Sequence, residues 1–316
     1  MPTAASWASD VRWFRSRLAA DVKRAPDTHG CCPVAVQMYG RYAQNSYRCC
    51  TDRLHELRPL RPTSLPAAHQ QQLMNASVAM VGDSLTEQLF ISTLCLLWAE
   101  GGAFQLRQLQ SAASCSYCPG VMWAATLTNS NTTLWFIRQH GTRMVEKASQ
   151  RLVEAANVLF IGFGQNTLPS NRAALDTMLE EYDALRGHQR PARVLVGEEM
   201  AQHWPGGTYS PIGQYPGREI CTAGDPVPNG TQRSADKLNT AIQGLAGRAR
   251  FAAGFRVLAL AALTSNRGDA HVGQVSDAVH IGPRGRDCLH WCIAPGITDA
   301  LGGAMLHGLS SAATLI

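Results

Sequence analysis

The sequence has little charge of either sign and no concentrated basic surface. Charged residues make up 16% of its 316 positions, and the formal net charge is +5. The densest basic segment, residues 10–24, also contains Asp10 and Asp21. Mixed charge of this kind is typical of a solvated helix face, whereas nucleic-acid binding needs basic residues gathered on one surface. We therefore expect no nucleic-acid partner.

Long apolar segments are also absent. The longest apolar runs, "LFISTLCLLWA" and "FRVLALAAL", are shorter than the about 20 residues of a transmembrane helix. The first residues lack the continuous apolar core of a secretory signal peptide. The hydrophobic content of 45% is that of an ordinary globular core. We expect a globular chain that shows no transmembrane segment and no signal peptide.

Cysteine, by contrast, is plentiful. The chain has ten cysteines, including the adjacent pairs Cys31–Cys32 and Cys49–Cys50. Neighbouring Cα atoms are about 3.8 Å apart, below the usual disulfide span of about 4.4–6.8 Å, so adjacent cysteines normally bond to other partners. Four such cysteines near the N-terminus indicate an oxidising compartment. The other six are Cys95, Cys115, Cys118, Cys221, Cys288 and Cys292.

Three Asn-x-Ser/Thr sequons point to the same compartment. They lie at Asn75, Asn131 and Asn229, and such asparagines accept glycans in secreted proteins. Together with the cysteines they favour a protein of the secretory pathway, such as the Golgi lumen, or an extracellular protein. Because the chain shows no targeting segment, we expect that segment to be missing from this sequence.

Two regions differ in pattern. Residues 1–70 combine a helix candidate, cysteine-rich stretches and the proline-punctuated "RPLRPTSLP", which predicts a cysteine-rich N-terminal arm. In residues 71–316, short apolar runs such as "SVAMV" alternate with helical stretches such as "RMVEKASQRLVEAA". This alternation indicates an α/β domain with a mainly parallel sheet. In such a domain, functional residues gather at the carboxyl ends of the strands.

The first strand end reads "VAMVGDSLTEQ" and places Ser84 where a strand stops and a helix begins. A hydroxyl there lies beside unpaired backbone N–H groups and the positive end of a helix dipole, which stabilise a developing oxyanion. The alternative is structural, because Ser84 and Glu87 have the spacing of a capping box with serine as N-cap. This stretch alone leaves both interpretations open.

A second strand end, "NVLFIGFGQNTLPS", contains Asn166. Its side-chain amide could donate to an oxyanion, while the neighbouring glycines let the backbone approach closely. An asparagine in an ordinary turn is the alternative.

The stretch "DCLHWCIAPG" near the C-terminus holds Asp287 and His290 three positions apart. One turn or tight loop can bring them together, and a carboxylate on one ring nitrogen leaves the other nitrogen free as a base. Asp269 and His271 form an alternative acid–histidine pair, and we prefer Asp287 and His290. His203 could approach a substrate, although a structural role is the better interpretation.

The same stretch also permits a zinc site. Four ligands of a tetrahedral ion could come from Cys115, Cys118, Cys288, His290 and Cys292. The gap between the two clusters is far longer than in compact zinc motifs, and an oxidising compartment favours disulfides. We therefore prefer the catalytic interpretation.

Taken together, "GDSL", "GQN" and "DCLHWC" resemble the sequence blocks of the SGNH (GDSL-type) hydrolase superfamily. More narrowly, the chain is similar to its PC-esterase and trichome birefringence-like branch over roughly residues 76–305. The stretches "RGDAH" and "GEEMAQHWPGG" also resemble segments of that branch. The resemblance implies a three-layer α/β/α sandwich of the flavodoxin-like type, with no cofactor and no metal.

By this resemblance Ser84 is the nucleophile, His290 the general base and Asp287 the acid that orients it. Asn166 and the backbone N–H of Ser84 would form the oxyanion hole. The implied activity is that of an O-acetyltransferase or acetylesterase, with a small acyl donor and a polysaccharide or glycoprotein glycan as acceptor. The remaining members of the two blocks are Gly82, Asp83 and Gly164.

The resemblance also implies a disulfide pattern. Cys221 would pair with Cys288, and Cys115 with Cys118. Cys95 and Cys292 would each pair with one N-terminal cysteine, and the two left over with each other, the four being Cys31, Cys32, Cys49 and Cys50.

Some positions depart from that branch. The loop after His290 is one residue longer, Thr167 replaces an aspartate of the second block, and an N-T-G-H-W-W segment of the plant proteins is absent. The substrate preferences of those proteins are therefore not carried over. A non-catalytic relative that binds glycans through exposed Trp123, Trp204 or Trp291 is the other interpretation.

Overall fold

In the computed structural model, the described residues are 34, 38, 73–99, 102–109, 120–128, 130–139, 147–163, 172–186, 193–204, 221, 230–246, 255–265, 271–274, 286–291 and 297–313. The strands are β1 (Ser77–Gly82), β2 (Phe104–Gln108), β3 (Gly120–Leu127), β4 (Thr132–Arg138), β5 (Val158–Ile161), β6 (Arg193–Gly197), β7 (Phe255–Leu258), β8 (His271–Gln274) and β9 (Arg286–Trp291). The helices are α5 (Ser84–Ala99), α6 (Lys147–Ala155), α7 (Arg172–Arg186), α8 (Gly230–Ala246), α9 (Leu260–Thr264) and α10 (Ile297–Ala313). Within these ranges, no helix combines the length and the apolar character that crossing a membrane requires.

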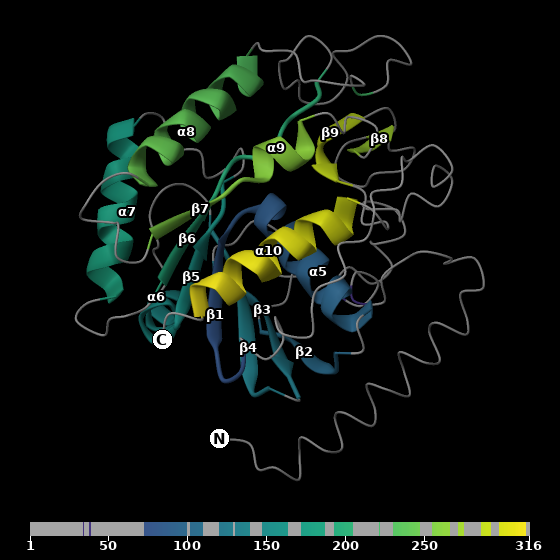
Figure 1. Cartoon of the computed structure of the whole chain (residues 1–316), viewed down its shortest axis with the longest axis vertical. Helices are drawn as coiled ribbons and strands as arrows, with labels where there is room; N and C mark the ends of the chain where they lie inside the picture. The colour runs from purple at the N-terminus through teal and green to yellow at the C-terminus, as the bar shows by residue number, and fades with distance from the viewer. Residues whose placement is uncertain are drawn as a thin grey trace.

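Seven strands form one sheet in the order β2-β3-β4-β1-β5-β6-β7. The strands β4, β1, β5, β6 and β7 run parallel, and β3 is antiparallel to both of its neighbours. A central strand such as β1 is apolar along its length because a parallel sheet is buried on both faces. β8 and β9 pair antiparallel in a separate small sheet (Figure 1).

Helices cover both faces of the large sheet (Figure 1). Successive residues of a strand face opposite ways, so Val78 and Met80 of β1 lie in one core cluster and Ala79 and Val81 in another. The first cluster includes the apolar residues of α5 and α10, and the second those of α6, α7 and α8. The predicted α/β/α sandwich with a mainly parallel sheet is confirmed.

Two residues of the predicted arm contribute to this core. Val34 and Met38 are helical and buried in the cluster that also contains α5. This part of residues 1–70 therefore packs with the α/β domain. The boundary near residue 70 stays a prediction, since the rest of the arm lies outside the described residues.

The turn from β1 into α5 leaves no room for a side chain at Gly82. A Cβ there would collide with the Thr86 side chain and would lie 2.7 Å from the Gly162 carbonyl oxygen. Gly162 follows β5 directly, and its N–H donates to the Val81 carbonyl at 2.8 Å. The glycine of the first block thus lets α5 begin at the very end of β1, where Ser84 lies.

Candidate active site

Asp83 caps α5. Its Oδ1 accepts the N–H of Leu85 at 3.0 Å, and its backbone carbonyl accepts the N–H of Glu87 at 3.0 Å. A side-chain acceptor two residues before the amide that it binds is the N-cap arrangement, and a carboxylate there also meets the positive end of the helix dipole. The capping box with Ser84 as N-cap is therefore wrong. Ser84 is the first helical residue, and its hydroxyl serves another partner.

That partner is His290. Oγ of Ser84 and Nε2 of His290 lie 2.8 Å apart, although 206 residues separate them in sequence. Both residues are partly exposed, while their chain neighbours Leu85, Leu289 and Trp291 are buried. A hydroxyl within hydrogen-bond reach of an imidazole, both accessible from outside, is the arrangement in which a histidine activates a nucleophile.

A glutamine of α5 clamps the strand that carries His290. Gln88, four residues after Ser84, donates from Nε2 to the Trp291 carbonyl at 2.9 Å and accepts the Trp291 N–H on Oε1 at 3.0 Å. The side chain of Gln88 is buried. Helix α5 therefore presents Ser84 at its start and fixes the backbone next to His290, so both groups share one support.

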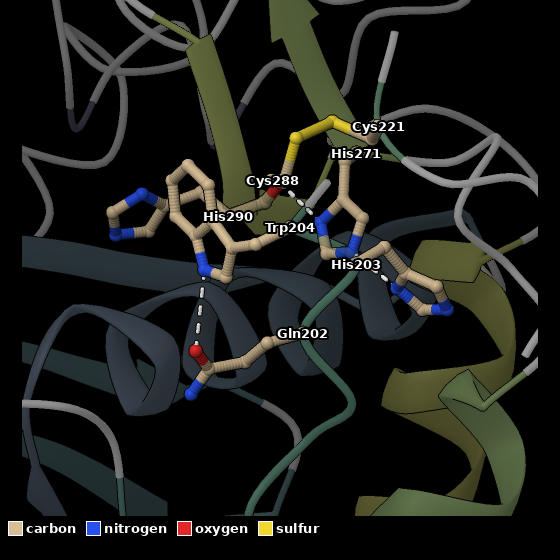
Figure 2. The surroundings of a disulfide bond; sticks show 7 residues. All are labelled: Gln202, His203, Trp204, Cys221, His271, Cys288 and His290. Atoms are coloured by element: carbon tan, nitrogen blue, oxygen red, sulfur yellow. Dashed lines mark hydrogen bonds between the residues drawn. A yellow bond between two sulfur atoms is a disulfide. The ribbon is translucent and has the colours of Figure 1, made fainter. Parts of the chain in front are cut away.

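A disulfide and further backbone bonds fix the rest of β9. Cys288 is bonded to Cys221 across a sequence separation of 67, which is the pairing that the resemblance implied. The Cys288 carbonyl accepts the N–H of His203 at 3.2 Å. The His290 carbonyl accepts a hydrogen bond from Nδ1 of His271 at 3.0 Å (Figure 2). The histidine strand is thus held at residues 288, 290 and 291.

Glu87 forms a salt bridge with Arg138. Arg138 ends β4 and is the register partner of Gly82, so the pair lies close to the start of α5. Burial raises the pKa of Glu87 above its usual value, and the guanidinium of Arg138 opposes that rise. His290 lowers the pKa of Glu87 by a smaller amount, which places this carboxyl within electrostatic range of the histidine.

Two adjacent buried glutamates after β6 differ in the hydrogen bonds that their carboxylates accept. Glu198 accepts hydrogen bonds on both oxygens, from Gln243 at 2.6 Å and from a backbone N–H of α9 at 3.1 Å. Glu199 accepts from Gln202 on Oε1 at 3.0 Å, and its Oε2 has no hydrogen-bond partner among the described residues. Burial, and next the negative charge of Asp83, hold the pKa of Glu199 well above its usual value.

We expect Glu199→Gln to stabilise the fold increasingly as pH rises. A raised pKa means that the folded state holds this proton more tightly than the unfolded chain does. The protein therefore loses stability as pH rises from about 4.3, the usual value for glutamate, toward the folded pKa. Glutamine is neutral at every pH, so the variant escapes this loss.

Chemical denaturation at several pH values measures the effect. The difference in unfolding free energy between variant and parent should grow from acidic to neutral pH. Glu198→Gln is the matched control and should destabilise the fold, because both oxygens of Glu198 are already bonded. A stability difference for Glu199→Gln that does not change with pH would contradict a raised pKa of Glu199.

Only part of the predicted site lies in the described residues. Asp287 and His290 both belong to strand β9, so the turn or tight loop expected between them is wrong. Asp287 is the register partner of Gly273, next to an irregularity in the β8–β9 register, and its side chain is outside what the structure describes. Asn166 and Gly164 are also outside, so the oxyanion hole and the orienting acid stay predictions. Cys95 is disulfide-bonded. The predicted pairings of the remaining cysteines fall outside the described residues, namely Cys31, Cys32, Cys49, Cys50, Cys115, Cys118 and Cys292.

Two of the three sequons occupy exposed turns. Asn75 and Asn131 have positive φ angles of 59° and 51°, a conformation that asparagine adopts more readily than most residues. Both residues are exposed. Asn229 lies outside the described residues, and glycosylation at all three stays a prediction.

The residues on which the zinc and glycan-binding alternatives depend are engaged elsewhere or buried. Cys288 is oxidised in its disulfide, and Nε2 of His290 faces the serine, so neither is placed to bind zinc. No cluster of three or more possible metal ligands occurs among the described residues. Trp123, Trp204 and Trp291 are 7%, 3% and 1% exposed, so they belong to the core and offer no exposed surface for stacking on sugars.

The histidine of the alternative acid–histidine pair, His271, bonds other groups than the serine. Both ring nitrogens of His271 are engaged, one with His203 and one with the His290 carbonyl, and Asp269 lies outside the described residues. His203 is buried, as its structural interpretation requires. Sequence reasoning missed Gln88, although a glutamine four residues after Ser84 in a largely apolar helix was a usable signal.

Comparison with known proteins assigns the chain to a family. A family model described as PC-Esterase, the GDSL/SGNH-like acyl-esterase family found in Pmr5 and Cas1p, matches residues 122–307. This range exceeds half of the chain and includes Asp287 and His290, while Ser84 precedes it. No curated protein matches the sequence.

Proposed function

This chain belongs to the PC-esterase family of GDSL/SGNH-like acyl-esterases, and from that premise we propose that it carries out serine-dependent acetyl ester chemistry on glycans. The observation that carries the proposal is the 2.8 Å contact between Oγ of Ser84 and Nε2 of His290. The reaction would pass through an acyl-enzyme on Ser84. A hydrolase or acyltransferase activity is what the family itself supports.

In the first half-reaction, Nε2 of His290 takes the hydroxyl proton as Oγ of Ser84 attacks the ester carbonyl. The bond between the acyl carbon and the leaving oxygen breaks, and His290 returns the proton to that oxygen. In the second half, an incoming hydroxyl gives its proton to His290 and attacks the acyl-serine. Free serine is restored when His290 returns the proton to Oγ.

Two further roles belong to this proposal. Asp287 would accept the Nδ1–H of His290, which keeps Nε2 available as a base. The backbone N–H of Ser84, at the first turn of α5 where amides lack helical acceptors, would stabilise the oxyanion together with Asn166.

The incoming hydroxyl decides between the two activities. Water gives an acetylesterase, and a sugar hydroxyl gives an O-acetyltransferase. Both use the same residues, so the outcome depends on whether an ordered acceptor outcompetes water at the acyl-enzyme. We favour transfer to a polysaccharide or glycoprotein glycan, on the basis of the resemblance to the trichome birefringence-like branch.

A partition experiment tests this choice. The acetyl donor is held constant, oligosaccharides of several glycan types are titrated, and released acetate is measured against acetylated sugar. Transfer predicts that acetylated sugar rises with acceptor concentration at the expense of acetate. Acetate as the only product with every acceptor would show an esterase, and an absence of both turnover and acyl-serine would leave a binding protein.

We also propose a lumenal or extracellular location. The Cys221–Cys288 disulfide and the oxidised state of Cys95 support it, because stable disulfides persist in oxidising compartments. Mass spectrometry of the natural protein for glycans at Asn75 and Asn131 would test it.

Gln88→Met should slow turnover by weakening the support of His290. Methionine keeps the volume but leaves the buried N–H and carbonyl of Trp291 without the amide, and small displacements of a catalytic group cost up to about 100-fold in rate. We expect kcat to fall about 10- to 100-fold with KM little changed.

Thr93→Val is the matched control on the same helix. Within the part of the chain that the structure describes, the Thr93 hydroxyl bonds the carbonyl of Leu89, one turn earlier in α5. Thr93→Val should leave kcat unchanged even where it alters stability. A folded Gln88→Met protein with the kcat of the parent would refute the role of the clamp.

A further inference from the structure

Two buried histidines lie next to the backbone of the candidate catalytic histidine, His290. His203 and His271 are 0% and 1% exposed, and their ring centroids are 4.8 Å apart. Nδ1 of His203 and Nε2 of His271 lie 2.7 Å apart, a hydrogen-bond distance. Figure 2 shows the two rings joined by this bond beside the Cys221–Cys288 disulfide.

The outer nitrogen of each ring faces a backbone carbonyl. Nε2 of His203 lies 2.9 Å from the Ser265 oxygen, and Nδ1 of His271 lies 3.0 Å from the His290 oxygen. A carbonyl oxygen can only accept, so both outer nitrogens must carry a hydrogen. In a neutral imidazole the other nitrogen is then a bare acceptor.

Two neutral rings cannot satisfy this chain of bonds. Nδ1 of His203 and Nε2 of His271 would face each other as bare lone pairs at 2.7 Å. One added proton between them turns the repulsive contact into an N–H···N hydrogen bond. Every N–H of the pair then has an acceptor, and these hydrogen bonds offset part of the cost of burying the charge.

We propose that His203 and His271 share one extra proton, and that this buried, singly charged pair positions His290. The function of the pair as positioning residues rests on the proposed acyl chemistry. The charge itself does not, because it follows from the two carbonyl acceptors.

The surroundings suit a cation. The His271 ring stacks on Trp291 with centroids 3.9 Å apart and planes inclined by 27°, and His203 meets the same indole edge-on at 5.9 Å. A cation over an indole face within about 6 Å is stabilised by the ring quadrupole. The charged pair thus contacts the Trp291 indole and donates to the two carbonyls.

The described elements around the pair carry few ionisable side chains. Helix α9, which precedes Ser265, carries no ionisable side chain, and β8 contributes none besides His271. Those nearest along the chain or around the candidate site are Glu198 and Glu199 after β6, Asp83 before α5, Glu87 with its partner Arg138, and His290 of β9. Arg286 and Asp287 also belong to β9, and their side chains lie outside what the structure describes.

The pair acts on His290 through the backbone. The donated hydrogen bond from His271 holds the carbonyl of the residue whose imidazole reaches Ser84, and Gln88 holds the next residue. Loss of the shared proton would leave two lone pairs in contact and push the rings apart. The His290 carbonyl would then lose its hydrogen-bond donor.

Nitrogen-15 NMR of the histidine rings tests the charge directly, using the full chain labelled at histidine. At about pH 7.5 a solvated histidine is mostly neutral, because its usual pKa is about 6.5. We expect the two rings together to carry three N–H hydrogens, one of them in an N–H···N bond. Signals are assigned with His203→Phe and His271→Phe. Two neutral rings with a single N–H each would overturn the proposal.

The positioning role has its own readouts. His271→Phe keeps a ring to stack on Trp291 but removes the donor to the His290 carbonyl. We expect it to shift the His290 Nε2 resonance and to lower kcat about 10- to 100-fold with little change in KM. His307→Phe, which removes an exposed histidine of α10, should change neither quantity.

The two readouts separate this inference from the proposed function. If the parent protein has no turnover, the proposed acyl chemistry is wrong. The number of N–H hydrogens on the two rings still tests the shared proton, and the shift of the His290 resonance still tests the positioning of His290. A folded His271→Phe protein with an unchanged His290 resonance would refute positioning.

Discussion

Ser84→Ala should abolish ester turnover while leaving the free energy of unfolding nearly unchanged. Loss of a serine nucleophile typically lowers kcat by about 10⁴- to 10⁶-fold. Stability is spared because Asp83 supplies the helix cap, and the Ser84 hydroxyl meets the partly exposed His290. Turnover of an acetyl ester and urea denaturation measure the two quantities.

Asp83→Ala provides the matched comparison for stability. Removing an N-cap side chain costs about 1 kcal/mol, so this variant should unfold more easily than Ser84→Ala. Ser84→Asp should be as inactive as Ser84→Ala. Full activity in either Ser84 variant would show that Ser84 is not the nucleophile. A stability loss in Ser84→Ala equal to that of Asp83→Ala would show that Ser84 contributes to the helix cap.

Removal of the Cys221–Cys288 disulfide should have the largest effect on stability. The bridge closes a loop with a sequence separation of 67, for which the chain-entropy relation gives about 4 kcal/mol. We expect the double variant Cys221→Ser/Cys288→Ser to lose stability of this order. Turnover should fall as well, because Cys288 lies two residues before His290 on β9.

The predicted Cys115–Cys118 pair offers a control within the same chain. It would close a loop of only a few residues, for which the same relation gives less than about 2 kcal/mol. Thermal unfolding of both double variants under non-reducing conditions compares the two bridges. Equal losses, or no loss for the Cys221/Cys288 variant, would contradict a role for this bridge in holding β9.

The fold was predictable because its signals are local. Apolar runs such as β1 alternate with helices that show apolar stripes, such as Leu175, Met178 and Leu179 of α7, and this alternation is sufficient for a parallel α/β sandwich. The choice between Asp83 and Ser84 as cap was not predictable, because both are good caps and they are adjacent.

The candidate site was predictable only where short motifs carry it. Ser84 and His290 lie in recognisable blocks, but the Gln88–Trp291 clamp joins residues 203 positions apart. The histidine pair likewise joins residues 68 positions apart. Sequence periodicity carries no information on such contacts, since tertiary packing alone brings them together. Helix α5 adds a further difficulty, because nearly all of its residues are buried and it shows no polar face from which to infer its partners.

Trapping the acyl-enzyme is the most direct test of the central claim. The protein is mixed with a chromogenic acetyl ester, quenched in acid and digested, and the peptides are examined by mass spectrometry. We predict one acetyl group on the peptide that contains Ser84, its loss when turnover is allowed to finish, and its absence from Ser84→Ala and after a serine-directed inhibitor. Sustained ester turnover with no acetyl group on Ser84, or undiminished turnover in Ser84→Ala, would contradict the account.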